Sequence, residues 1–147
     1  MVNKQKVKGT KWENDLTKII KENIPMTKQA KRVAGSGAIG NTLDEPLLKG
    51  DVVLDFYGFP QKFRIEAKTG YGGNSQLTIR REWLNKIVEE AEESYSIPAL
   101  ACKFLGAKES GGVQYFIIFD LDTFISIINY VNDLKRELDL IYESIGE

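Results

Sequence analysis

Apolar residues recur at helical spacing in three stretches of the chain, over residues 10–23, 80–94 and 122–144. Thr10 is the expected N-terminal cap of the first helix. The apolar face of that helix consists of Trp12, Leu16, Ile19 and Ile20. The third helix has more apolar residues than one buried stripe needs. Core packing is the interpretation for most of them, and a subunit interface is the alternative.

Short apolar runs between the helices predict strands over residues 51–56, 62–68, 99–105 and 113–119. The first two runs are separated by a turn that contains Gly58 and Pro60, which predicts a β-hairpin. A further short strand is predicted around residues 32–34. This order of elements predicts an α/β fold with a mixed central sheet flanked by helices.

The length of 147 residues predicts a single domain over residues 1–147, with a flexible basic N-terminus over residues 1–9. No uninterrupted apolar run approaches the roughly 20 residues that a membrane span requires. We therefore expect a cytoplasmic protein without a membrane partner, located in the host cytoplasm if the protein is phage-encoded.

The chain contains no histidine, which removes Ser-His and Cys-His dyads, His-ligated zinc sites and histidine general bases. Its single cysteine, Cys102, has apolar neighbours that are typical of a buried strand position. We do not expect a nucleophile there, because a reactive thiolate needs a base or a positive environment. Any catalysis therefore relies on carboxylates, lysine, tyrosine or a metal ion.

The net charge of −1 hides an asymmetry along the chain. Residues 1–32 contain nine basic and three acidic side chains, whereas acidic side chains prevail around residues 89–93 and near the C-terminus. A polyanion such as DNA would be steered toward the basic side. A lysine-rich, solvated helix is the alternative interpretation, and the charge pattern alone does not separate the two.

Asp51, Glu66 and Lys68 are the candidates for catalysis. Asp51 opens one predicted strand, and alternation along the next strand turns Glu66 and Lys68 to one face. Two carboxylates, with the Ala67 carbonyl as a further oxygen ligand, suit the binding of Mg²⁺. Such a cation activates water against a phosphodiester, and Lys68 would hold or help to deprotonate that water. Asp55 is the competing carboxylate, and an ordinary surface ion pair is the alternative without catalysis.

The spacing of Asp51 and Glu66-Ala67-Lys68 matches the acid…(Asp/Glu)-x-Lys signature of the PD-(D/E)xK nucleases. From Gly9 to about Phe119, the chain resembles the archaeal-type Holliday junction resolvases, including their phage-borne relatives. The resemblance also rests on four short motifs, namely Gly9-x-x-x-Glu13, Arg32…Gly35-Ser36-Gly37, Gly50-Asp51 and Glu66-Ala67-Lys68-Thr69.

The resemblance implies a restriction-endonuclease-like fold and a homodimer that cuts four-way DNA junctions in pairs with Mg²⁺, for which Mn²⁺ can substitute. The implied catalytic residues are Glu13, Ser36, Asp51, Glu66 and Lys68. The implied metal ligands are Asp51, Glu66, Ala67 and Glu13. In this family an arginine often follows the helix glutamate, whereas this chain has Asn14, so that Lys11 or Lys18 takes over a phosphate contact.

Basic side chains near the motifs are the candidates for DNA binding, namely Arg32, Lys11, Lys31, Arg80 and Arg81. The planar guanidinium of Arg32 suits a phosphate. The glycines beside the Ser36 hydroxyl would let backbone N–H groups approach a phosphate as well. Two rival functions remain open from the sequence. One is an endonuclease of the same superfamily that acts on duplex or flapped DNA, and the other is a catalytically silent DNA-binding module or assembly factor.

Overall fold

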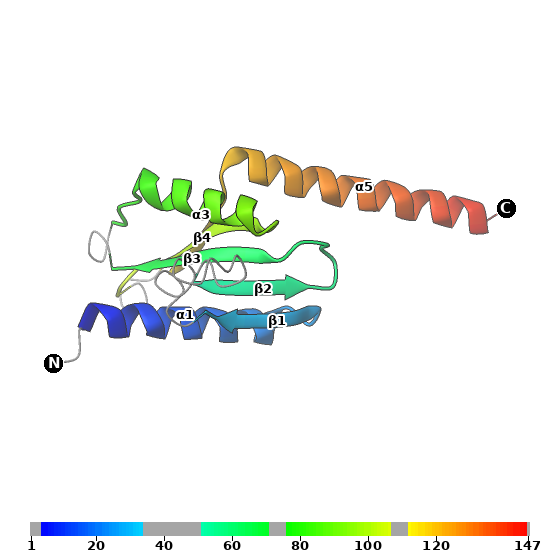
Figure 1. Ribbon diagram of the computed structural model, residues 1–147. Coiled ribbons are helices and arrows are strands. Elements are labelled where there is room, and N and C mark those ends of the chain that lie inside the picture. Colours follow the sequence, from blue (N-terminus) through cyan, green and yellow to red (C-terminus); the bar gives the residue numbers. More distant parts are fainter. Residues whose placement is uncertain (1–3, 34–50, 71–75, 107–111, 147) are drawn as a thin grey trace.

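The computed structural model describes residues 4–33, 51–70, 76–106 and 112–146. In these ranges a five-stranded sheet lies between helices on its two faces (Figure 1). The elements follow in the order α1 (Lys4–Asn23), β1 (Thr27–Arg32), β2 (Val52–Phe56), β3 (Phe63–Thr69), α3 (Arg81–Glu93), β4 (Ile97–Lys103), β5 (Tyr115–Ile118) and α5 (Leu121–Ile145).

The sheet is mixed, and its strands are ordered β1-β2-β3-β4-β5. Strands β1, β2 and β3 are antiparallel neighbours, β3 and β4 are parallel, and β4 and β5 are antiparallel. The parallel pair requires a crossover connection, which helix α3 provides. The predicted α/β fold with a mixed central sheet flanked by helices is therefore confirmed.

Helix α1 covers one face of the sheet with the apolar stripe that its sequence predicts. Trp12 and Leu16 are buried there against Ile65 and Ala67 of β3. The indole Nε1 of Trp12 also donates a hydrogen bond of 3.1 Å to the Ala101 carbonyl. Since side chains alternate along a strand, the even-numbered residues of β3 must face the other side, where helix α3 packs.

Two local predictions need correction. Helix α1 begins at Lys4, so Thr10 lies inside the helix and is not its N-terminal cap. Residues 4–9, which were predicted to belong to a flexible terminus, are therefore helical. Val7 is the only residue with a large apolar side chain among them, so the apolar periodicity gave no indication of the added turns. The first strand covers Thr27–Arg32 instead of residues 32–34, because its pairing with β2 decides its limits.

Helix α5 contradicts the interpretation that most of its apolar residues pack in the core. It has no buried residue, and every residue from Val131 to Gly146 is exposed. In its first half, Ile127 packs against the core and the Tyr130 hydroxyl donates a 2.9 Å hydrogen bond to the Gly58 carbonyl. Figure 1 shows that the second half extends past the sheet.

Within the described ranges, no helix is long and apolar enough to cross a membrane.

Candidate active site

Glu66 and Lys68 lie side by side at the C-terminal end of β3, on the face covered by α3. The Lys68 ammonium is 2.8 Å from Glu66 Oε1, and both side chains are largely shielded from solvent. The second carboxylate oxygen, Oε2, is buried and receives no hydrogen bond from the described residues. Alternation along β3 thus brings the two groups together as the sequence predicts.

Asp51 directly precedes β2 and is held against the same end of β3. Its backbone N–H donates to the Ile65 carbonyl over 2.9 Å. Its carboxylate Oδ2 accepts a hydrogen bond of 2.9 Å from the Ala67 N–H. The backbone ladder between β2 and β3 therefore places the Asp51 carboxylate beside the strand that carries Glu66 and Lys68.

The pKa of the Asp51 carboxyl is raised from 3.8 to about 6. Burial is the largest cause, followed by the negative charge of Glu66 and, to a smaller extent, that of Glu13. The Ala67 N–H and the Lys68 ammonium act in the opposite direction. Several carboxylates thus share a small, partly dehydrated space, which is an environment that favours a bound cation.

Glu13 and Arg32 approach this end of the sheet from the side of α1. The Arg32 guanidinium forms an ion pair with Glu13, and both side chains are mostly covered. The guanidinium also lies 3.4 Å from the Thr10 hydroxyl. The structure thus pairs two predicted site residues with each other: a helix carboxylate orients the arginine at the end of β1.

Helix α3 contributes two side chains that the sequence analysis did not single out. Lys86 Nζ lies 3.5 Å from Glu66 Oε2, and the Trp83 ring centroid lies 4.9 Å from Lys68 Nζ. Trp83 is one helical turn before the buried Ile87. This spacing places Trp83 on the buried face of α3, but the sequence does not reveal which strand that face covers.

Three further residues were predicted to belong to the site, namely Ser36, Lys11 and Lys31. Ser36, with Gly35 and Gly37, lies outside the described residues. Lys11 is exposed on α1, and Lys31 is exposed on β1 directly opposite Val53 of β2. Val53 in turn pairs with Arg64 of β3, and paired residues point to the same face of a sheet. Arg64, Glu66 and Lys68 alternate along β3 to one face, so Lys31 shares that face.

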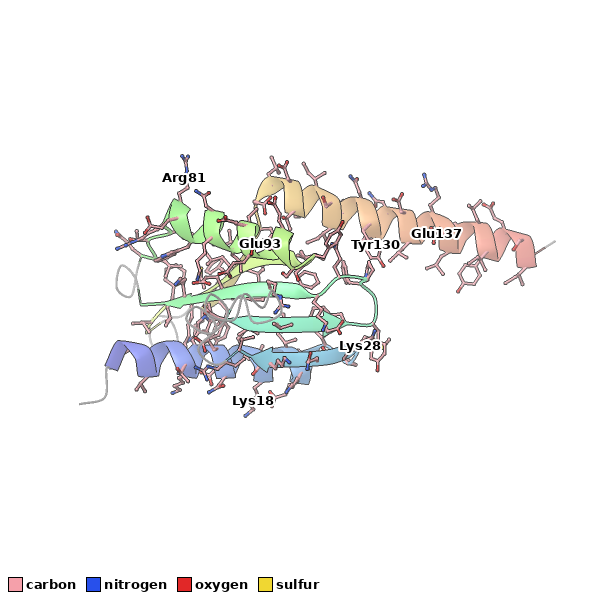
Figure 2. All side chains as sticks on the ribbon, in the orientation of Figure 1. Lys18, Lys28, Arg81, Glu93, Tyr130 and Glu137 are labelled. Carbon is pink, nitrogen blue, oxygen red and sulfur yellow. The ribbon has the colours of Figure 1, made fainter. Side chains whose placement is uncertain are left out.

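Arg80 and Arg81 lie at the start of α3, and their side chains point in different directions. The Arg80 guanidinium lies 5.8 Å from the Trp83 ring centroid and forms an exposed ion pair with Glu82. Arg81 points away from the sheet (Figure 2). Only the first of the two adjoins the Lys68 site in the described part of the chain.

Cys102 lies on β4 opposite Lys68 and is fully buried. Burial raises the pKa of its thiol to about 11. The prediction of a structural strand cysteine is confirmed.

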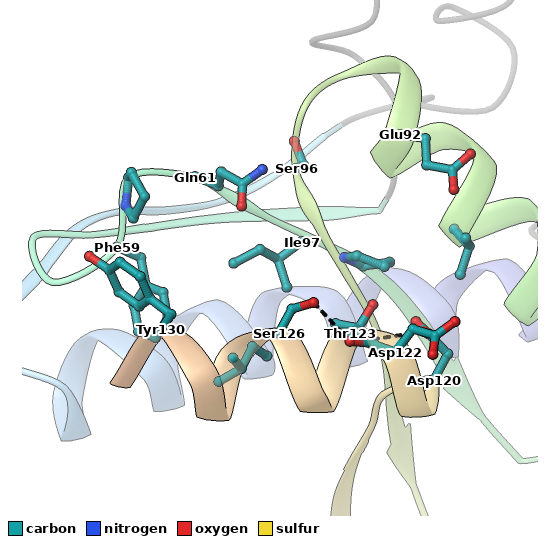
Figure 3. Close-up of a pocket in the computed structure, with 14 residues that line it drawn as sticks. Phe59, Gln61, Glu92, Ser96, Ile97, Asp120, Asp122, Thr123, Ser126 and Tyr130 are labelled. Atoms are coloured by element: carbon teal, nitrogen blue, oxygen red, sulfur yellow. Dashed lines mark hydrogen bonds between the residues drawn. The ribbon is translucent and has the colours of Figure 1, made fainter. Parts of the chain in front are cut away.

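A pocket of about 340 Å³ lies at the other end of β3, between the β2–β3 turn, the end of α3 and the start of α5 (Figure 3). Its lining is mostly apolar, with Asp120, Asp122 and Glu92 at the side of the helices. Asp120 caps helix α5 by accepting a hydrogen bond from the Thr123 N–H. The described residues that line this pocket include none of the predicted site residues.

A mixed sheet that gathers an aspartate, a glutamate and a lysine at one end, on adjacent strands, defines the class of PD-(D/E)xK nucleases. The family model described as "Phage putative PDDEXK endonuclease" matches residues 4–132, and the chain belongs to this family. The predicted membership of the PD-(D/E)xK nucleases, in a phage-borne branch, is confirmed.

Among solved structures, the chain is similar to Hjc, a Holliday junction resolvase from the archaeal hyperthermophile Archaeoglobus fulgidus. The TM-score is 0.48 at 20% sequence identity, and the match covers 79% of this chain and 86% of that chain. No curated protein matches the chain.

Proposed function

We propose that this nuclease resolves four-way DNA junctions by paired, metal-dependent cleavage of two strands, in recombination and repair within the host cytoplasm. The observation that carries the proposal is the convergence of Asp51, Glu66 and Lys68 at one end of the sheet. The choice of a junction as substrate is supported by the resemblance of Glu13 and Arg32, which are neighbours at this site, to the motifs of junction resolvases.

The chemistry of the site fits a divalent cation. Within the described ranges, no three ligand-type side chains are close enough together to enclose an ion. However, Glu66 Oε2 is a buried acceptor without a hydrogen bond, and the pKa of Asp51 is raised by burial and by the neighbouring carboxylates. Mg²⁺, which keeps several water ligands, needs only one or two protein carboxylates.

Asp51, Glu66 and the Ala67 carbonyl would hold Mg²⁺ or Mn²⁺, with Glu13 as a further carboxylate nearby. The cation would lower the pKa of a bound water and neutralise charge on the phosphodiester. Lys68, as an ammonium, would hold that water and stabilise the negative charge that develops on the phosphodiester. Arg32, held by Glu13, contacts a phosphate.

We further propose that the protein works as a homodimer, which would place two active sites on one junction. Support comes from helix α5, whose apolar residues alternate at spacings of three and four, as in helices that pair with other helices. These residues are Phe124, Ile127, Val131, Leu134, Leu138, Ile141 and Ile145, named here the α5 seam. The part of the seam from Val131 onward is exposed.

The decisive experiment compares Asp51→Asn and Glu66→Gln with Asp55→Asn on a labelled four-way junction. The first two variants should bind the junction, yet their cleavage with Mg²⁺ should fall more than about 100-fold, because even outer partners of metal ligands typically contribute 10- to 100-fold. Asp55→Asn changes the same functional group farther along β2 and should cleave normally. Normal cleavage by both Asp51→Asn and Glu66→Gln would exclude this active site.

A panel of DNA substrates separates junction resolution from its rivals. Paired nicks confined to the four-way junction support resolution, whereas equal cutting of duplex or flapped DNA indicates a different endonuclease of the superfamily. Absence of cleavage of every substrate with Mg²⁺ and with Mn²⁺ indicates a silent DNA-binding module.

A further inference from the structure

The face of α3 that covers the active site carries an aromatic ring directly over the candidate catalytic lysine. The Trp83 ring centroid lies 4.9 Å from Lys68 Nζ, and the same ammonium is 2.8 Å from Glu66 Oε1. Lys68 therefore contacts both a carboxylate of its own strand and an indole ring of the helix packed above it. The Lys68 side chain is only 18% exposed.

The physical effect of this arrangement is to restrict a flexible side chain. A lysine ammonium sits on a four-carbon stem with many accessible rotamers, and ordering it costs conformational entropy. The face of an indole attracts a cation more strongly than a tyrosine or phenylalanine ring does. The ring thus favours rotamers that keep the ammonium beside Glu66, and it does so without forming a hydrogen bond that would compete with a water or a phosphate.

We propose that Trp83 is a positioning residue, which holds the Lys68 ammonium in place for phosphodiester cleavage through a cation–π contact. The kinetic part of this inference rests on the proposed nuclease function. The structural part concerns only the order of the Lys68 side chain, and it can be tested in the absence of DNA.

The structural test is NMR on the full chain, with side-chain labelling of lysine. In the wild type, the Lys68 ε-methylene protons should show an upfield ring-current shift, and relaxation of the ammonium group should report restricted motion. Trp83→Leu, which keeps an apolar side chain without a ring, should abolish the shift and loosen the ammonium. Trp83→Phe should retain much of both effects. A wild type without the ring-current shift overturns the proposal, even if Trp83→Leu does not fold.

The kinetic test separates positioning from simple packing. Single-turnover cleavage of the junction at saturating enzyme should be roughly 3- to 30-fold slower in Trp83→Leu, the range that corresponds to a cation–π contact. Trp83→Phe should restore most of the rate, and the junction Kd should be nearly unchanged in both variants. Equal rates for Trp83→Leu and wild type, equal losses in Trp83→Leu and Trp83→Phe, or a loss in Kd alone would each overturn the proposal.

The two proposals fail in different ways. If the wild type cleaves no branched, flapped or duplex DNA, the nuclease proposal fails, and the NMR comparison of Trp83→Leu with Trp83→Phe then decides whether Trp83 orders Lys68. If the wild type cleaves but Lys68 is equally mobile in all three proteins, only the positioning role is refuted.

Discussion

Asp51 is a carboxylate whose charge the folded protein disfavours in the absence of a cation. Its pKa is about 6 in the folded state, so the folded protein binds this proton more tightly than the unfolded chain. The contribution of Asp51 to stability is therefore full below about pH 4, and it is lost as the pH rises through about 6. At neutral pH the ionised Asp51 carboxylate therefore destabilises the metal-free fold, and a bound cation would offset this effect.

We predict that Asp51→Asn stabilises the metal-free protein at pH 7. The shift in pKa corresponds to a gain on the order of 3 kcal/mol in the free energy of unfolding. The gain should shrink as the pH is lowered and should vanish near pH 4. Urea denaturation in a chelating buffer at several pH values measures it, and equal stability of variant and wild type at pH 7 would contradict the raised pKa.

Mg²⁺ provides a control for that measurement. Addition of Mg²⁺ at pH 7 should raise the Tm of the wild type, because a ligand that binds only the folded state stabilises it by mass action. The same addition should leave the Tm of Asp51→Asn nearly unchanged.

Residue types and local spacing indicated Asp51, Glu66 and Lys68 before the fold was known, since alternation along one strand depends only on the sequence. The same spacing could not indicate the ion pair between Glu13 and Arg32. These two residues belong to different elements, and their contact depends on how α1 packs against the edge of the sheet.

At the scale of secondary structure, helix α5 shows the limit of sequence periodicity. A repeated apolar spacing marks a face that avoids water, yet it does not reveal whether that face meets its own sheet or another molecule. Here the first half of α5 lies against the β2–β3 turn, and the exposed second half of the α5 seam is left for a partner. The subunit-interface alternative therefore stays a prediction, with this surface as its location.

We predict that the double change Leu134→Lys and Leu138→Lys converts a dimer into a monomer. Both side chains are exposed in the isolated chain, at 38% and 49%, so the fold should survive while like charges face each other across the seam. Sedimentation equilibrium gives the mass, and circular dichroism reports the fold. Leu140→Lys, at an exposed position outside the seam, should remain dimeric. A monomeric wild type at the same concentration would refute the interface.

In the molecule as a whole, basic side chains lie near the end of the sheet that holds the proposed catalytic groups. Lys31 lies on the edge strand β1 and on the sheet face that carries Glu66 and Lys68. Arg80 reaches the same region from the start of α3. A DNA backbone that entered the site from the edge of the sheet would thus meet basic groups from two elements.

We predict that Lys31→Gln weakens junction binding through loss of a phosphate contact. The slope of log K against log salt concentration should decrease in magnitude by about 0.9, the value expected for one neutralised phosphate of duplex DNA. Titrations by fluorescence anisotropy at several salt concentrations give the slope. Arg136→Gln removes the same charge from the exposed side of α5 and should leave the slope unchanged, and an unchanged slope for Lys31→Gln would exclude that contact.

The types of the elements, the mixed sheet, the shared face of Glu66 and Lys68, and the nuclease signature could all be predicted from the amino-acid sequence. These features depend on local periodicity and on residue chemistry within short segments. The folded protein was needed to see that Trp83 covers Lys68, that Glu13 binds Arg32, and that the second half of the α5 seam is exposed. Such contacts join residues that are far apart in the chain, and they arise from the packing of whole faces, which no single segment encodes.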